Sequence, residues 1–474
     1  MTPAPQAVAG IPPASSVSSL SSAWWQGSSG SSPGAEPLGR LLSDRPLLGW
    51  SDHRARWGPL PAIDPARLIR QVDAAGIRGR GGAGFPTARK LAAVAAAAGR
   101  RRLPAVVLVN GCEGDPTSTK DAVLIDRSPH LVIDGALAVA AAVRADRALL
   151  AVHPGPTASA LAAALAQRSD ASAVVDVVVV PPRYIASEAT ALVRFLDTGD
   201  ARPAGRLTPV WERGAGGRPT LVLNAETVAE VALLARFGAD WFAAVGAQDE
   251  PGTALVTVTG AVSWPGVLEV PIGASVRAIL RAAGAADPSW VLVGGLAGRW
   301  VDVRRAGDIA FSTAGLAGVG ALFGVGSLVV LPPGGCVLGE TARILRHHAD
   351  AGARQCGPCM FGLPAIAADV AALAAGDRAA LDRLHRRLPM IDGRGACGHP
   401  DGAVALAASA LRTLTGPERE HLAQHLTARR CSAPAPVVPL GGSFAGGLPA
   451  GFSAGSSGGS SGGASGGSSG GGPR

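Results

Sequence analysis

Three cysteines in the last third of the chain have the residue type and spacing of metal ligands. Cys356 and Cys359 enclose Gly-Pro in one short turn, and Cys397 follows in a separate segment. Two thiolates from a turn and a third from a distant loop can ligate one iron-sulfur cluster. Of the six cysteines only Cys112 lies elsewhere, and Cys431 has the character of an incidental residue. This clustering does not indicate a disulfide framework.

The Cys-Gly-Pro-Cys string has two other interpretations. It is the usual form of a thioredoxin-type redox dithiol, and its thiolates would also suit zinc. A thioredoxin motif opens a helix after a strand, whereas helical patterns lie on both sides of Cys356 and Cys359. A dithiol also has no place for Cys397. The pattern therefore favours the cluster over the dithiol, and zinc stays open as an alternative.

A glycine-rich stretch at residues 76–90 is a candidate phosphate site. Glycines let a backbone approach a phosphate closely and adopt positive φ, which leaves amide groups for anionic oxygens. The Ala-rich helix predicted directly after it adds its N-terminal dipole, and Arg80, Arg89 and Lys90 add positive charge. A glycine cluster alone is as readily a flexible surface loop.

The order of residues in this stretch is more specific than its composition. It contains Gly79-Arg80-Gly81-Gly82-Ala83-Gly84-Phe85, then Pro-Thr, with Lys90 shortly after. This string closely resembles the FMN loop of the NADH-oxidising flavoprotein (F-type) subunit of respiratory complex I, a family that includes related bacterial NADH dehydrogenases and hydrogenases. The resemblance implies that the loop binds FMN, that Phe85 packs on the nicotinamide-bearing ligand and that Lys90 reaches the flavin phosphate.

A second match lies at residues 110–121, directly after a predicted strand. Ligands of open α/β sheets bind at the carboxyl ends of strands, although an acidic turn is the simpler explanation of such a segment by itself. In the family the matching segment contacts FMN and NADH, which implies that role for Asn110, Glu113 and Asp115, with Pro116, Lys120 and Asp121 also in pattern. Cys112 departs from it.

The third match begins at Tyr184 and resembles the family's Tyr-Ile-x-Gly-Glu-Glu-Thr-Ala-Leu segment. Glu188 keeps the first of the two carboxylates, and Ala189 replaces the second. The pair helps to hold the dinucleotide in the family. The Lys-Pro-Pro-Phe-Pro stretch, which supplies an aromatic partner for adenine, is eroded at residues 206–210. These departures weaken the expectation of NADH binding more than that of FMN binding.

The fourth match, at residues 217–227, resembles Gly-x-Pro-Thr-x-Val-Asn-Asn-Val-Glu-Thr. It implies that Asn224 and Thr227 offer hydrogen bonds to the flavin, which would tune its potential. An N-cap at the end of a strand is the structural alternative for the same residues. Four matches in the family's order are difficult to assign to chance.

The cysteines complete the resemblance with one departure. The family binds a [4Fe-4S] cluster through Cys-x-x-Cys-x-x-Cys and a distant fourth cysteine, and Gly362 stands in place of the third. The resemblance thus implies cluster ligation by Cys356, Cys359 and Cys397. The missing ligand could come from Cys336, from His399, from water or from a partner protein.

Hydrophobic patterning predicts the elements that carry these motifs. Apolar β-type runs alternate with Ala-rich helical runs up to about residue 246, which indicates an α/β domain with a largely parallel sheet. Short alternating strands around one helix then suggest a small β-grasp module, and a C-terminal helical bundle follows. The expected domains are a low-complexity segment 1–40, an FMN/NADH-binding α/β domain 41–246, a β-grasp module 247–335, a helical iron-sulfur domain 336–430 and a Gly/Ser-rich disordered tail 431–474.

Composition excludes several protein classes. A hydrophobic fraction of 47% in 474 residues is enough for several cores, so the chain is not disordered as a whole. A net charge of +8 comes with only 16% charged and 4% aromatic residues, which does not indicate nucleic-acid binding. Glycines and the Pro-Pro pair interrupt the uncharged stretch 309–339, so no membrane span is expected there. The N-terminus has no secretory pattern, which predicts a cytoplasmic protein.

The expected activity is that of an NADH dehydrogenase-type oxidoreductase. NADH passes a hydride to FMN, and single electrons continue through the iron-sulfur cluster to a partner. That partner would be a ferredoxin, a thioredoxin-like ferredoxin subunit or a larger oxidoreductase complex. Hydride transfer needs no side-chain acid or base, so no catalytic residue is nominated. Two alternatives stay open, which are a ferredoxin-linked relay that does not bind NADH and a cofactor-poor scaffold or ligand-binding descendant.

Overall fold

The computed structural model describes residues 39–43, 45–205, 208–414, 419–428 and 435–440. The low-complexity segment expected at 1–40 and the tail expected at 431–474 fall almost wholly outside these residues, as do positions 206 and 207 of the eroded segment. No helix in the described part of the chain is both long and apolar enough to cross a membrane.

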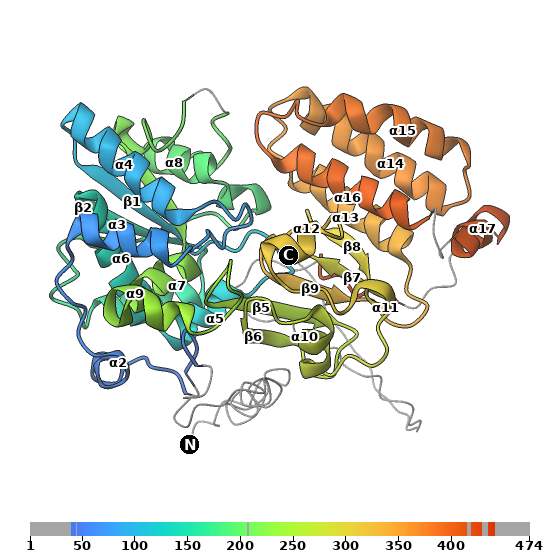
Figure 1. The fold of residues 1–474 in the computed structure, drawn as a ribbon. Helices are drawn as coiled ribbons and strands as arrows, with labels where there is room; N and C mark the ends of the chain where they lie inside the picture. Colours follow the sequence, from blue (N-terminus) through green and yellow to red (C-terminus); the bar gives the residue numbers. More distant parts are fainter. Residues whose placement is uncertain (1–38, 44, 206–207, 415–418, 429–434, 441–474) are drawn as a thin grey trace, which may run out of the picture.

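The first unit is built on a parallel sheet, as the alternating pattern predicts. Its strands are β1 (Ala105–Asn110), β2 (Ala145–Val152), β3 (Val175–Val179) and β4 (Thr220–Asn224). They are ordered β3-β2-β1-β4, and every neighbouring pair is parallel. Because parallel strands end at the same edge, the segments after β1 and β4 meet there. Figure 1 shows this unit on the left.

Helices flank this sheet and form its core. Two of them at its centre are α6 (Pro129–Val143), almost entirely buried, and α9 (Ala225–Ala243). They pack closely because Gly135 has no side chain, and a Cβ there would collide with the backbone of Val228. The other helices of this unit are α2 (Trp50–Trp57), α3 (Pro65–Ala74), α4 (Thr87–Arg101), α5 (Lys120–Arg127), α7 (Pro156–Leu165) and α8 (Ala189–Thr198).

The second unit is a mixed five-stranded sheet in the order β6-β5-β9-β7-β8. Its first and last strands, β5 and β9, pair in parallel at the centre, and the other pairs are antiparallel. This is the arrangement of the expected β-grasp module. Its elements are β5 (Thr253–Gly260), β6 (Gly266–Pro271), α10 (Val276–Ala282), β7 (Trp290–Val293), β8 (Arg299–Asp302), α11 (Val303–Ala306), α12 (Thr313–Ala317) and β9 (Ser327–Val330).

The third unit is helical and lies at the upper right of Figure 1. It consists of α13 (Val337–Ala351), α14 (Leu363–Ala374), α15 (Ala379–Ile391), α16 (His399–Thr413) and α17 (Arg419–Ala428). A short π-helical turn, Pro358–Gly362, leads into α14. The cysteines therefore lie where the sequence places them, at the ends of helices.

The backbone of Leu296 joins all three units. Its N–H donates to the carboxylate of Asp115 in the first unit, over 2.7 Å. Its carbonyl accepts from Nε2 of His348 on α13, over 3.1 Å. Because these bonds are buried, each contributes to fixing the units against one another.

Candidate functional site

The glycine-rich loop precedes α4 and is closed by a hydrogen bond from the amide of Gly79 to the carbonyl of Phe85, over 2.9 Å. Gly82 and Gly84 have φ of 115° and 59°, a region that favours glycine. A Cβ at either position would face open space. Ala83 lies between them and is exposed, and the ring of Phe85 is 45% exposed. One side of the loop therefore presents backbone with no side chain in the way.

Lys90 lies beside this loop in the first turns of α4. Its ammonium is 3.5 Å from the carbonyl oxygen of Val222 and 5.9 Å from the centre of the Phe85 ring. No carboxylate in the described part of the chain lies within ion-pair distance of it. Burial lowers the pKa of Lys90. A half-buried cation without an anionic partner beside an open glycine loop suits a phosphate.

Arg80 points into the protein. Its side chain is 3% exposed, with Nε 3.1 Å from Glu230 and Nη1 3.7 Å from Glu250. Its amide donates to the hydroxyl of Thr227 over 2.9 Å. Arg80 and Thr227 were both predicted to contact the ligand. In the structure they contact each other, and this hydrogen bond holds Gly81 and the rest of the loop in place.

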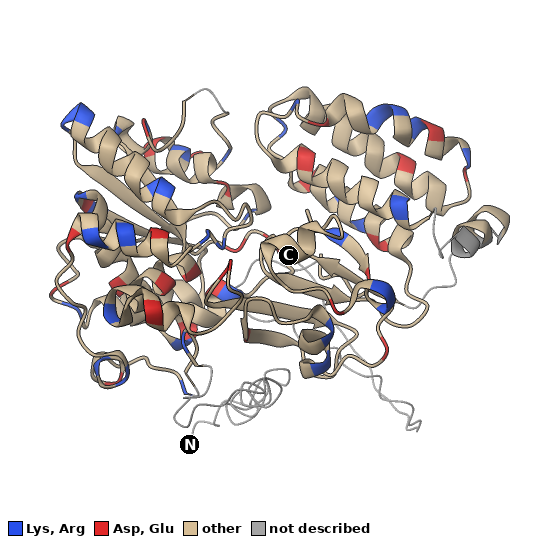
Figure 2. Cartoon of the chain, viewed as in Figure 1, with Lys and Arg blue, Asp and Glu red and all other residues tan. Residues whose placement is uncertain are grey.

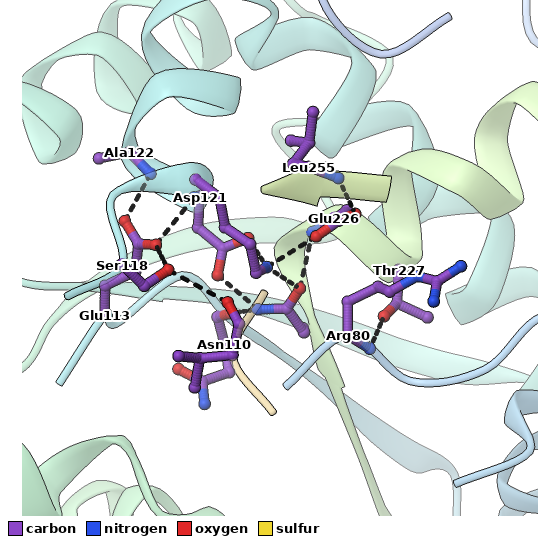
Figure 3. Close-up of polar contacts among 12 residues, drawn as sticks. Arg80, Asn110, Glu113, Ser118, Asp121, Ala122, Glu226, Thr227 and Leu255 are labelled. Atoms are coloured by element: carbon purple, nitrogen blue, oxygen red, sulfur yellow. Dashed lines mark hydrogen bonds and ion pairs between the residues drawn. The ribbon is translucent and has the colours of Figure 1, made fainter. Parts of the chain in front are cut away.

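A polar network links the ends of β1 and β4 (Figure 3). The ammonium of Lys120 lies 2.7 Å from Asp121, 2.8 Å from Glu226 and 3.0 Å from the side-chain oxygen of Asn224. The amide of Asn224 donates to Asp121 and to the carbonyl of Asn110. Burial by itself lowers the pKa of Lys120, but the carboxylates of Asp121 and Glu226 outweigh it, so that pKa is raised.

Two further predicted residues of this edge are also engaged. Glu113 accepts from the hydroxyl of Ser118 and from the amides of Asp121 and Ala122, so it caps α5. Burial, and then the charge of Asp121, raise the pKa of Glu113 to about 7. Asp115 accepts from Thr117 and Leu296. These carboxylates therefore fix the loop after β1.

The segment beginning at Tyr184 lies between this edge and the helical unit. Glu188 accepts from the amides of Thr190 (2.9 Å) and Ala191 (3.0 Å), which makes it the N-cap of α8. Ala189 is the first residue of that helix. The side chain of Asn110 donates to the carbonyl of Ser187 over 2.8 Å, which ties the segment to β1.

Aromatic rings connect this segment to the cysteines. The ring of Tyr184 lies 5.3 Å from the rings of His348 and His399, measured between centroids. A cavity of about 390 Å³ opens beside them, lined by Arg183, Tyr184, Ile185, Arg202, His347, Asp350 and residues 351–354. The sequence did not single out His348.

The three cysteines are near neighbours. The sulfur of Cys359 accepts from the amide of Arg354 over 3.2 Å, and the sulfur of Cys397 accepts from the amide of His399. Burial raises the pKa of both thiols, and Cys356 raises them further. Within the described residues, no three His, Cys, Asp or Glu side chains are close enough to share a single metal ion. A cluster spaces its thiolates over different irons, so this does not conflict with it.

The structure bears on the missing third cysteine and on one suggested replacement for it, Cys336. A Cβ at Gly362 would lie 2.8 Å from Cγ1 of Ile391, so the third cysteine position is filled by packing. Cys336 caps the opposite end of α13, where its sulfur accepts from the amide of Gly339 and contacts His425. A helix of this length separates Cys336 from Cys356 by roughly 20 Å. The suggestion that Cys336 supplies the missing thiolate is therefore wrong.

Gln355 is a functional candidate that the sequence reasoning missed. It precedes Cys356, accepts from Arg194 over 3.0 Å and donates to the carbonyl of Pro203 over 3.0 Å. Glu226 was also missed, although it lies inside the fourth match at residues 217–227. Its carboxylate accepts from the amide of Leu255 over 2.8 Å as well as facing Lys120. No local pattern marks Gln355, because its partners are distant in sequence.

Comparisons with known proteins agree with this geometry. Residues 72–233 match the Nuo51 FMN-binding domain, and residues 340–420 match the NADH-ubiquinone oxidoreductase-F iron-sulfur binding region.

Full-length relatives extend the match. The chain is 30% identical to the second F subunit of the NADH-quinone oxidoreductases of Rhizobium meliloti, over 83% of this chain and 96% of the relative. It is 29% identical to the NADH-quinone oxidoreductase F subunit of Streptomyces coelicolor, over 78% and 85%. Among solved structures, an NAD+-reducing [NiFe]-hydrogenase in the H2-reduced state aligns with a TM-score of 0.71 and 28% identity, over 84% of this chain and 67% of the other.

Proposed function

The chain belongs to the family of NADH-quinone oxidoreductase F subunits, and on that premise we propose that Lys90 and the loop Gly79–Gly84 hold the phosphate of the FMN through which it oxidises NADH. Electrons then pass through an iron-sulfur cluster to a partner protein. The single observation that carries the proposal is the ammonium of Lys90, which has no carboxylate partner in the described chain and lies beside glycines whose Cβ directions are open.

The residues present fit FMN. An open backbone loop, a helix N-terminus and an unpaired ammonium are together the donor set of a phosphate site. FMN, when bound, accepts a hydride and releases electrons singly. The chain's own residues position the groups that would contact FMN. Thr227 and Glu230 hold Arg80 and thus the loop. Lys120 holds Asn224 at the end of β4.

Three of the four ligand positions of a [4Fe-4S] cluster are occupied by cysteines in this chain. Cys356, Cys359 and Cys397 supply thiolates, and Ile391 closes the place of the remaining cysteine. These thiols would hold the cluster at the helical side of Tyr184. The rings of Tyr184 and His399 contact each other with their centroids 5.3 Å apart and their planes tilted by 58°.

The dinucleotide site departs from the family in its carboxylates. Glu188 is engaged as the cap of α8, and Ala189 offers no side-chain oxygen. We infer that NADH is held by fewer polar contacts here, with the exposed ring of Phe85 as its main apolar platform. A weaker hold on NADH, and not loss of the activity, is the expected consequence. NADH as the reductant also supports a cytoplasmic location.

The partner is proposed to be an acidic iron-sulfur electron carrier. Met360, Phe361 and Met390 are 49%, 72% and 63% exposed, and the contact of Gly362 with Ile391 brings them together beside the thiols. Arg386 lies one helical turn from Met390 on the same face, and Figure 2 shows basic segments along α15. An apolar centre with basic residues around it suits an acidic partner.

Anaerobic purification of the full chain, followed by an absorption spectrum and NADH titration, tests the function. Flavin bands together with broad visible absorption of a cluster, both bleached by NADH, are the expected result. Flavin that NADH does not bleach would overturn the dehydrogenase activity. A colourless protein that takes up neither FMN nor iron would overturn the whole proposal.

A further inference from the structure

One loop of the β-grasp module, residues 322–327, reaches two segments of the proposed flavin site. Gly324 pairs with Gly82 of the glycine-rich loop in an isolated antiparallel β-bridge. At the end of the same loop, the hydroxyl of Ser327 lies 2.9 Å from the hydroxyl of Thr117, in the segment that follows β1. A loop from the second unit therefore borders both segments of the first unit.

Phe323 in this loop lies against the side chain of Arg80. The centre of its ring is 5.3 Å from the guanidinium carbon, which is within the range of a cation–π contact. Glu230 and Glu250 approach the same guanidinium to 3.1 and 3.7 Å. Because the Arg80 side chain is buried, the contact is desolvated, and a cation–π contact is strongest under that condition.

Phe323 has a fixed position within its own module. Its ring packs on the ring of Phe311, with the centroids 4.5 Å apart, and Phe311 is fully buried in the core of the module. The backbone directly after it is also fixed, because a Cβ at Gly324 would collide with the carbonyl oxygen of Gly294 at the end of β7. Arg80 therefore rests on a ring that the module holds in place.

We propose that Phe323 is a positioning residue for the flavin, because it holds Arg80, and through Arg80 the glycine-rich loop, in the conformation that binds the FMN phosphate. The inference rests on the proposed function and deepens it, since it makes the β-grasp module a part of the flavin site. The backbone of Arg80 is fixed by Thr227 of the first unit, and its side chain by Phe323 of the second.

Loss of the Phe323 ring should affect binding of the phosphate group in particular. In the proposed site the phosphate is held by Lys90 and the loop amides, which depend on the position of the loop. Riboflavin has the same isoalloxazine ring without the phosphate, so its affinity should not depend on how the loop is held. A general loss of folding would weaken the binding of both flavins. The ratio of the two affinities therefore reports on the position of the loop.

The test is fluorescence titration of the full chain, freed of flavin, with FMN and with riboflavin. Phe323→Leu keeps an apolar side chain without an aromatic face, and should weaken FMN binding about five- to tenfold while riboflavin binds as to the wild type. Phe323→Tyr keeps the aromatic face and should keep the FMN affinity. Leu322→Ala, which truncates the exposed neighbouring side chain, is the control and should change neither affinity. An unchanged FMN affinity in Phe323→Leu, or equal losses for the two flavins, would overturn the proposal.

Phosphorus NMR of the FMN-loaded chain gives a readout that does not depend on affinity. The resonance of bound FMN should shift in Phe323→Leu, and Phe323→Tyr should keep the wild-type position. Gly324→Ala should shift the resonance as well, because the added methyl does not fit against Gly294. Gly266→Ala, whose methyl would meet open space on β6, is the matched control and should not. Identical resonances in the wild type and Phe323→Leu would contradict a role of this ring in placing the phosphate.

The same titrations separate this inference from the proposed function. A wild-type chain that binds no FMN overturns the proposed function and this inference together. A wild-type chain that binds FMN more tightly than riboflavin, with the same preference in Phe323→Leu, overturns only the role of Phe323.

Discussion

The Cβ direction of Gly362 ends on the side chain of Ile391: a Cβ built there would lie 2.8 Å from Cγ1 and 3.0 Å from Cδ1. Ile391 is 4% exposed and belongs to the core of the helical unit. The position of the third cysteine is thus already filled by packing in this chain. Restoring the thiol by one substitution is therefore not enough.

Gly362→Cys should destabilise the chain by about 1–3 kcal/mol, because it overpacks a filled position. Ile391→Ala should cost about 2–5 kcal/mol through the cavity it leaves. The double variant should lose less free energy of unfolding than the two single variants lose together, because the smaller residue 391 makes room for the larger residue 362. Urea unfolding of the four proteins measures this coupling, and simple additivity would show that the two residues do not compete for space.

Lys90→Met should weaken FMN binding about ten- to a hundredfold, because a charge-assisted contact to phosphate contributes about 1.5–3 kcal/mol. Riboflavin, which lacks the phosphate, should bind both proteins equally. Arg89 was expected to add charge to this site, but its side chain is exposed in the structure, so Arg89→Met should leave the FMN affinity close to wild type. Fluorescence titration with the two flavins measures these affinities, and equal losses for FMN and riboflavin would argue against a phosphate contact.

Ala189→Glu should tighten NADH binding about fivefold, by restoring one carboxylate hydrogen bond worth about 1 kcal/mol. Position 189 is the first residue of α8, where a negative charge is also favourable to the helix. Ala189→Gln adds the same bulk without the charge and should give a smaller gain. The KM for NADH with ferricyanide as acceptor is the measurement, and an unchanged or raised KM in Ala189→Glu would count against this site.

Glu269 should make stability depend on pH. It is buried, accepts from the amides of Leu41 and Leu42 and from Thr253, and burial raises its pKa to about 7. A raised carboxyl pKa means that the folded chain holds the proton longer than the unfolded chain does. The contribution of Glu269 to the free energy of unfolding is complete below about pH 4.3. It is lost as pH rises to about 7, a change on the order of 3 kcal/mol.

Glu269→Gln should remove this dependence. The unfolding free energy of the wild type should fall relative to the variant between those two pH values. Glu212→Gln, a change at an exposed glutamate, should follow the wild type. Parallel stability curves for the wild type and Glu269→Gln would show that the carboxyl group is not perturbed.

Phe361→Ala should slow electron transfer to an acidic iron-sulfur carrier about tenfold, as expected when an exposed apolar anchor is removed from an interface. Ferricyanide reduction should be unchanged, because a small acceptor needs no docking surface. Leu322→Ala removes an equally apolar side chain, 51% exposed, from another surface and serves as the control. The carrier-dependent rate should also fall with added salt. A similar slowing in Leu322→Ala would rule out a docking role specific to Phe361.

The sequence predicted the order of the units and the parallel sheet because burial periodicity and turn residues are local signals. It could not predict the orientation of Arg80, which turns inward because Glu230 and Glu250 converge on it from distant segments. Glu188 was expected to contact the dinucleotide, and in the structure it caps α8. The domain boundaries and the ligand roles of individual residues stay predictions, since packing does not test them.

Gln355 couples two regions that serve different steps. It precedes the first thiol, and its side chain grips the carbonyl of Pro203, close to the segment that replaces the family's adenine-binding stretch. Thermodynamic linkage is reciprocal, so any ligand that moved Pro203 would change the free energy of the thiol turn by the same amount by which a change in that turn alters the affinity for the ligand. If the proposed roles hold, one amide side chain connects the dinucleotide end of the chain to the turn that carries the first thiol.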